Sequence, residues 1–102
     1  MKTRVASRWR NTVLVCRKCS KKLGGGFGPD GDKPLAKALR SHVGGGKGRK
    51  AGAGIVEVGC LKICPKHAVT VVDGRHPENW LIVREGADVA EVAGMLGLDQ
   101  TQ

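Results

Sequence analysis

Hydrophobic residues fall into short runs along the chain, and the spacing within each run predicts its secondary structure. Four runs rich in β-branched residues, bounded by glycine, proline or charged residues, are typical of buried strands. They lie at residues 11–16, 55–58, 69–72 and 80–83. The Asp73-Gly74 pair predicts a turn directly after the third strand.

Two further segments have the period of an amphipathic helix. Residues 33–43 form the first. The second begins after Asp88, carries Glu91 at the spacing of a capping box and ends at Gly97. Their apolar faces consist of Leu35, Ala38 and Leu39 in the first helix and Val89, Val92, Ala93 and Leu96 in the second. The lysine- and glycine-rich residues 19–31 predict no regular element.

The predicted order of elements is β-α-β-β-β-α, which indicates an α/β fold with a mixed four-stranded sheet and two helices. If the first two strands are parallel, they are joined by a right-handed crossover and their carboxyl ends meet at one edge of the sheet. A chain of 102 residues holds one domain. We expect it to span residues 12–97, after a basic N-terminal extension at 1–11 and before a C-terminal tail at 98–102.

Composition narrows the class of protein. The aromatic residues are Trp9, Phe27 and Trp80, so the core is expected to consist of valine, leucine, isoleucine and alanine. The longest apolar stretches are about five residues, too short for a membrane-spanning helix or an ordinary secretory signal. We therefore expect a cytoplasmic protein. Residues 1–12, rich in arginine and without acids, leave a mitochondrial transit peptide as the alternative.

Positive charge is concentrated in the first half of the chain. Residues 1–50 carry 14 lysines and arginines against two acids, a net charge of +12, whereas residues 51–102 carry a net charge of −3. A basic half attracts an acidic protein or a nucleic acid. It lacks the interleaved aromatic residues on which single-stranded nucleic acids stack, and a solvated basic surface is the simpler interpretation.

The four cysteines form two closely spaced pairs. Cys16 and Cys19 follow the first predicted strand with C-x2-C spacing, and Cys60 and Cys64 follow the second with C-x3-C spacing. A parallel crossover would therefore bring both pairs to one edge of the sheet. Structural disulfides are not expected in a reducing compartment, so the candidates are zinc, an iron–sulfur cluster and a redox dithiol.

One stretch of the chain resembles a known family. The run V-E-V-G-C-L-K-I-C-P-K-H-A-V-T-V-V, with V-L-V-C upstream and W-L-I-V downstream, resembles the thioredoxin-like [2Fe–2S] ferredoxins. The same fold forms the small iron–sulfur subunit of respiratory NADH dehydrogenase. The resemblance covers residues 12–97, and its most specific parts are G-C-x3-C and the following A-V-T-V-V strand. The family spaces its first two ligands more widely than this chain does.

The resemblance implies a thioredoxin-like fold and a [2Fe–2S] cluster that transfers electrons, with no catalysis by the polypeptide. It implies four cluster ligands: Cys16, Cys19, Cys60 and Cys64. Ferredoxins are usually acidic, so the net charge of +9 suggests an acidic redox partner. Its docking residues are expected to be Lys18, Lys21 and Lys22, beside the first cysteine pair.

Other interpretations remain open. The main alternative is a zinc-binding module that docks nucleic acid through the basic half. In one form of it, His67 joins Cys16, Cys19 and Cys64 as a zinc ligand. A redox dithiol or metal-delivery protein is a third interpretation. It is disfavoured because a thioredoxin-type pair lies at a helix N-terminus, and the residues after Cys19 predict no helix.

The oligomeric state is also open at this point. The fourth predicted strand can pair with a second copy and form a homodimer. Glu78 and Arg84 flank that strand, and charged residues of this kind can equally prevent edge-to-edge pairing.

Overall fold

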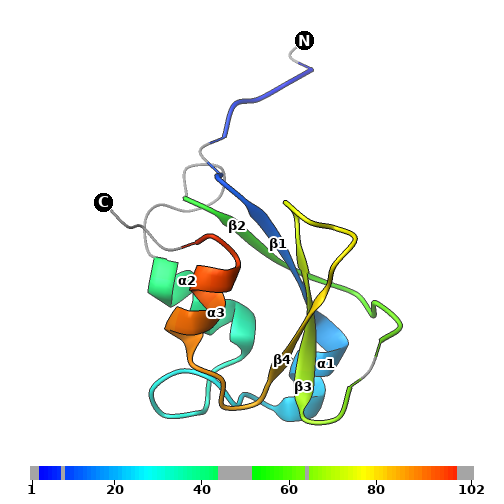
Figure 1. Cartoon of the computed structure of the whole chain (residues 1–102), viewed down its shortest axis with the longest axis vertical. Helices are drawn as coiled ribbons and strands as arrows, with labels where there is room; N and C mark the ends of the chain where they lie inside the picture. Colours follow the sequence, from blue (N-terminus) through cyan, green and yellow to red (C-terminus); the bar gives the residue numbers. More distant parts are fainter. Residues whose placement is uncertain (1–2, 8, 44–51, 64, 99–102) are drawn as a thin grey trace.

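The chain folds into a four-stranded sheet with helices on both of its faces (Figure 1). The computed structural model describes residues 3–7, 9–43, 52–63 and 65–98. In chain order the elements are β1 (Thr12–Cys16), α1 (Arg17–Leu23), α2 (Leu35–Val43), β2 (Gly54–Val58), β3 (Ala68–Asp73), β4 (Leu81–Arg84) and α3 (Val89–Met95). The predicted α/β class is confirmed.

The sheet is mixed, as predicted, with the strand order β2-β1-β3-β4. β1 pairs with β2 in parallel, and the pairs β1–β3 and β3–β4 are antiparallel. In the parallel pair Cys16 lies opposite Val58, so the carboxyl ends of β1 and β2 are level at one edge of the sheet. All four predicted strands are present, and their ends differ from the predicted ones by one residue or less.

The prediction of two helices is wrong, because α1 was missed. Cys19 and Ser20 are buried while Lys21 and Lys22 are exposed, which gives this short segment one buried face. The helix ends at Gly24, whose φ of 65° is left-handed. Lysine is a good helix former, but the glycines that follow favour a loop, so this helix of about two turns was not predicted. The order of elements is therefore β-α-α-β-β-β-α.

The two predicted helices are confirmed. α2 begins after Pro34, as expected for a proline at a helix start. α3 begins after Asp88, whose carboxylate accepts a hydrogen bond of 3.1 Å from the N–H of Ala90. In the described residues, no helix is both long and apolar enough to cross a membrane.

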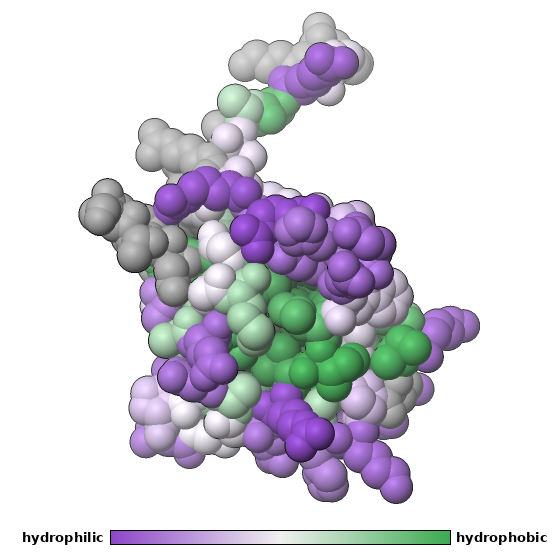
Figure 2. Space-filling model, viewed as in Figure 1, coloured by the Kyte–Doolittle hydropathy of each residue, from purple (hydrophilic) through white to green (hydrophobic). Residues whose placement is uncertain are grey.

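The main core lies between the sheet and the helices α2 and α3, which Figure 1 shows together on one side of the strands. As predicted, it is mostly aliphatic, and Phe27, which precedes α2, is the buried aromatic residue among those described. Its fully buried members include Val13, Val15, Leu35, Leu39, Val69, Val71, Val92 and Leu96. Apolar surface is left in the middle of the view in Figure 2, where Figure 1 places β4.

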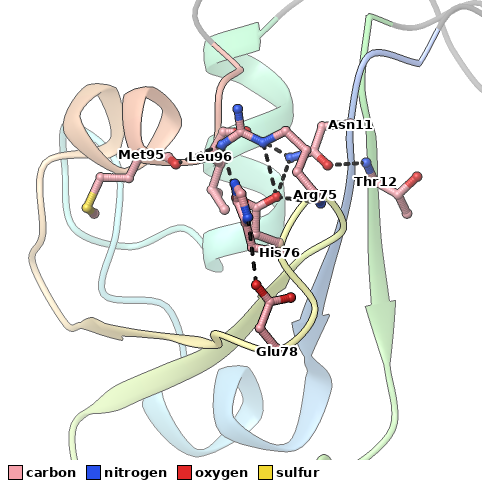
Figure 3. Close-up of polar contacts among 8 residues, drawn as sticks. Asn11, Thr12, Arg75, His76, Glu78, Met95 and Leu96 are labelled. Carbon is pink, nitrogen blue, oxygen red and sulfur yellow. Dashed lines mark hydrogen bonds and ion pairs between the residues drawn. The ribbon is translucent and has the colours of Figure 1, made fainter.

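A buried polar network closes the end of the sheet away from the cysteines (Figure 3). The Asn11 side-chain amide donates to Asp73 Oδ1 at 2.9 Å and to the Leu96 carbonyl at 2.8 Å. The Arg75 guanidinium donates to Asp73 Oδ2 at 3.0 Å and to the Met95 carbonyl at 3.1 Å. These bonds join the start of β1, the end of β3 and the C-terminus of α3. We call these three side chains, Asn11, Asp73 and Arg75, the polar clamp.

Candidate metal centre

The first cysteine pair lies where β1 passes directly into α1. Cys16 is both the last residue of β1 and the N-cap of α1, and Cys19 lies one helical turn later. Both residues are buried, with exposed fractions of 0% and 2%. The C-x2-C pair thus lies at a helix N-terminus, and the argument against a redox dithiol from the absence of a helix is wrong.

Three backbone N–H groups act to lower the pKa of the Cys16 thiol, and one of them comes from the loop after β2. Burial alone would raise the pKa of this thiol, but the N–H groups of Cys19, Leu61 and Lys18 outweigh it, and the pKa is lowered. Leu61 directly follows Cys60. The loop after β2 is therefore bound to the first pair, as the parallel crossover predicted.

Cys19 has the opposite electrostatic balance. Burial raises the pKa of its thiol, and the neighbouring Cys16 sulfur raises it further, against hydrogen bonds from Thr70 that lower it. The Cys19 Sγ lies 3.7 Å from the Ile63 carbonyl oxygen, which also accepts a 3.0 Å hydrogen bond from the Thr70 hydroxyl. Two adjacent buried sulfurs thus share one environment, and without a cation only one of them is readily a thiolate.

The second cysteine pair is described in part. Cys60 is exposed, and its sulfur accepts a 3.3 Å hydrogen bond from the N–H of Lys62. Lys62 has a φ of 71°, in the left-handed region, which turns the loop back over the first pair. Cys64, the fourth predicted ligand, lies outside the described residues. It stands in sequence between Ile63, whose carbonyl faces Cys19, and Pro65.

His67 lines the same hollow as Cys19, together with Lys22 and Pro65. Its side chain is 84% exposed, and its Nδ1 lies 4.0 Å from Oε1 of Glu85. Among the described residues, which leave out Cys64, no three His, Cys, Asp or Glu side chains are close enough together to hold a metal ion. The arrangement brings Cys16, Cys19 and the loop that carries Cys60 to one edge of the sheet.

Sequence reasoning missed two groups at this site. One is α1, whose N–H groups bind the Cys16 sulfur, and the other is Thr70, which holds both Cys19 and the Ile63 carbonyl. The sequence did carry a signal for Thr70. It alternates with the core residues Val69 and Val71 of β3, so its side chain lies on the opposite face of the sheet.

Comparison with protein-family models, with curated proteins and with solved structures finds no match to this chain.

Proposed function

We propose that this chain is a small electron-transfer protein with a thioredoxin-like fold that holds a [2Fe–2S] cluster. Cys16, Cys19, Cys60 and Cys64 would be the ligands. When bound, the cluster accepts and donates one electron at a time. The polypeptide itself catalyses no reaction; its residues bind the cluster, shield it and set its potential.

The observation that carries this proposal is the contact between the two cysteine segments. The Ile63 carbonyl oxygen, next to Cys64, lies 3.7 Å from the Cys19 sulfur, and the N–H of Leu61, next to Cys60, helps to lower the pKa of the Cys16 thiol. Segments about forty residues apart in sequence thus meet at their cysteines. The strand order and directions, β2-β1-β3-β4 with only β1 and β2 parallel, also agree with a thioredoxin-like fold.

The donor set fits an iron–sulfur centre chemically. Thiolates are its usual protein ligands, and hydrogen bonds from backbone N–H groups to the sulfurs raise the reduction potential. Lys18, Cys19 and Leu61 supply such bonds to Cys16. The exposed lysines of α1 would further favour the reduced state, since reduction adds a negative charge.

The test is the visible spectrum of protein purified without oxygen from iron-replete cells. We expect a red-brown protein whose visible absorbance is bleached by dithionite and returns on reoxidation. A colourless preparation that contains no iron and no acid-labile sulfide contradicts the proposal.

One observation favours a second function, that of a redox dithiol. Cys16 at the N-terminus of α1 has a lowered pKa and Cys19 a raised one, which is the asymmetry of an attacking and a resolving thiol. Both sulfurs are buried, which opposes reaction with a large substrate. Thiol titration of the protein as isolated separates the two functions. In a dithiol protein, an added disulfide reagent oxidises Cys16 and Cys19 to a disulfide and is itself reduced, and a dithiol reductant reverses the reaction; in a cluster protein these thiols do not titrate until the iron is removed.

A further inference from the structure

The two faces of the sheet are covered to different extents. One face carries the aliphatic core and is covered by α2 and α3. On the other face, which carries Cys16, α1 packs against β1 and β3, and the Trp9 ring lies over Gly54 at the start of β2. We call the rest of this second face, with Leu14, Val56 and Ile82 and the adjoining loop residue Ile63, the open face. Val56, Ile82 and Ile63 are 37%, 49% and 47% exposed.

The open face adjoins the cysteines directly. Ile82 of β4 is the cross-strand partner of Thr70, and the Thr70 hydroxyl binds the Ile63 carbonyl. That carbonyl faces the Cys19 sulfur. The half-exposed Ile63 and Ile82 therefore lie on either side of Thr70, whose hydroxyl binds the same carbonyl as the Cys19 thiol. Figure 2 shows apolar surface where β4 runs and again on the loop beside it.

Exposed cations lie on the elements that border this apolar centre. They are Arg17, Lys18, Lys21 and Lys22 on α1, Lys62 and Lys66 on the cysteine loop and Arg84 at the end of β4. None of them forms an ion pair with another residue in the described part of the chain. Two acids lie in or directly after these strands: Glu57, which is half-buried in β2, and Glu85, which follows β4 and lies beside His67. The excess of positive charge at this end is thus uncompensated.

We infer that the open face and its ring of cations form the docking surface for an acidic protein that presents aliphatic side chains at the centre of its own contact. This inference rests on the proposed function, since a partner docked here lies next to the cysteines and exchanges electrons over the shortest path. Acidic groups of the partner would meet the lysines of α1 and the loop, while Ile63 and Ile82 would be buried at the centre.

Two other occupants fit the surface less well. A second copy of this chain would bring two uncompensated cationic rings together. A nucleic acid would satisfy the lysines, but the aliphatic centre offers its phosphates and bases no hydrogen bonds.

The probe is a fluorescent helical peptide of about 18 residues, or five turns, with leucines on one face and glutamates on the other. Its anisotropy is titrated with the protein as isolated. A scrambled peptide of the same composition separates charge from the apolar contact, and single-stranded DNA of equal charge tests the nucleic-acid alternative. We expect saturable binding of the helical peptide that weakens steeply with salt and exceeds that of both controls.

Paired variants locate the surface. Ile82→Glu should weaken peptide binding about tenfold or more, because it places a buried charge among acidic groups. Met95→Glu makes the same change at a residue that is 51% exposed on α3 and should alter binding by less than about twofold. If Ile82→Glu unfolds, a second pair of variants makes the same comparison outside the sheet. Lys62→Glu should weaken peptide binding, and Lys37→Glu on α2 is its control.

The inference is overturned if the helical peptide does not bind at low salt, or if the scrambled peptide or the DNA binds as tightly. It is also overturned if the two variants of a pair weaken binding equally. A dimer in sedimentation that Ile82→Glu dissociates would show that a second copy occupies the open face. The visible spectrum of the same samples keeps the two proposals distinct. Coloured protein that fails to bind the peptide overturns the docking surface alone. Colourless protein that binds it overturns the cluster alone.

Discussion

The two ends of the sheet satisfy their polar groups in different ways. At the end that holds the polar clamp, Asn11 and Arg75 donate to Asp73 and to the last carbonyls of α3. At the other end, the sulfurs of Cys16 and Cys19 accept N–H groups, share one environment and lie under exposed lysines. Charge is balanced within the protein at the first end and unbalanced at the second.

This difference indicates that one end of the sheet contributes mainly to stability and the other mainly to binding. The polar clamp is complete in itself and ties β1, β3 and α3 together, so its main effect is on stability. At the cysteine end, the proposed cluster would let several sulfurs ionise together, and the proposed acidic partner would meet the lysines. Substitutions at the two ends should therefore affect different measurements.

The largest expected effect is at the cysteine end. Cys60→Ser should remove most of the iron and visible absorbance, because a hydroxyl is a poor replacement for a thiolate and the other three cysteines of the chain are already proposed ligands. Far-ultraviolet circular dichroism should retain the α/β spectrum. His67→Gln is the control and should keep both iron and colour, since His67 faces Glu85.

Cys19→Ser is a stricter test of the ligand set. Cys16 and Cys19 are closer in sequence than the first two ligands of the thioredoxin-like ferredoxins, so Cys19 is the ligand that departs from the family pattern. We expect the cluster to be lost here too. A variant that retains full iron and an unchanged spectrum would remove Cys19 from the ligand set.

At the clamp end, Asn11→Ala should lower the free energy of unfolding by about 2–3 kcal/mol, because Asp73 and the Leu96 carbonyl lose a buried donor. Urea unfolding measures this loss. Asn79→Ala, an exposed change, should stay within about 0.5 kcal/mol of the parent. The visible spectrum should be the same in both variants, and loss of colour in Asn11→Ala would contradict the separation of the two ends.

Acid should weaken the clamp in a defined direction. Burial alone would raise the pKa of Asp73, but the hydrogen bonds from Arg75 and Asn11 outweigh it, and the pKa is lowered. Its contribution to stability is therefore complete above the unfolded value of about 3.9 and is lost as the pH falls through the lower folded value. Asp73→Asn should flatten the acid limb of the stability curve, and an unchanged limb would contradict this role.

The smallest expected difference is between two left-handed glycines, one at each end. Gly24 after α1 and Gly97 after α3 have φ values of 65° and 68°. An added Cβ at Gly24 meets open space, whereas at Gly97 it meets the Arg75 guanidinium. Gly24→Ala should cost about 1 kcal/mol and Gly97→Ala measurably more in thermal unfolding. Equal losses of stability in the two variants would show that the Arg75 side chain moves aside without measurable cost.

Much of this comparison was predictable from local sequence patterns, and part of it was not. The β-branched runs and the period of Leu35, Ala38 and Leu39 gave the strands and two helices, because each follows its own burial pattern. The meeting of Cys16 with the Cys60 loop followed from one parallel pair of strands.

What sequence reasoning missed depends on contacts between distant segments. α1 has a single buried turn, made of Cys19 and Ser20, that packs on the sheet, and its helix propensity alone is weak evidence. In the polar clamp, Asn11 binds Asp73 and Leu96, which lie 62 and 85 positions later in the sequence. No local sequence pattern predicts contacts at such separations.

The most direct test of the central proposal is a count of metal and sulfide per chain in anaerobically purified protein, with an electron paramagnetic resonance spectrum after reduction. We expect about two iron and two sulfide ions per chain and a single low-temperature signal from one unpaired electron. One tightly bound zinc ion per chain, without iron, sulfide or such a signal, would contradict the proposal that this is a [2Fe–2S] electron carrier.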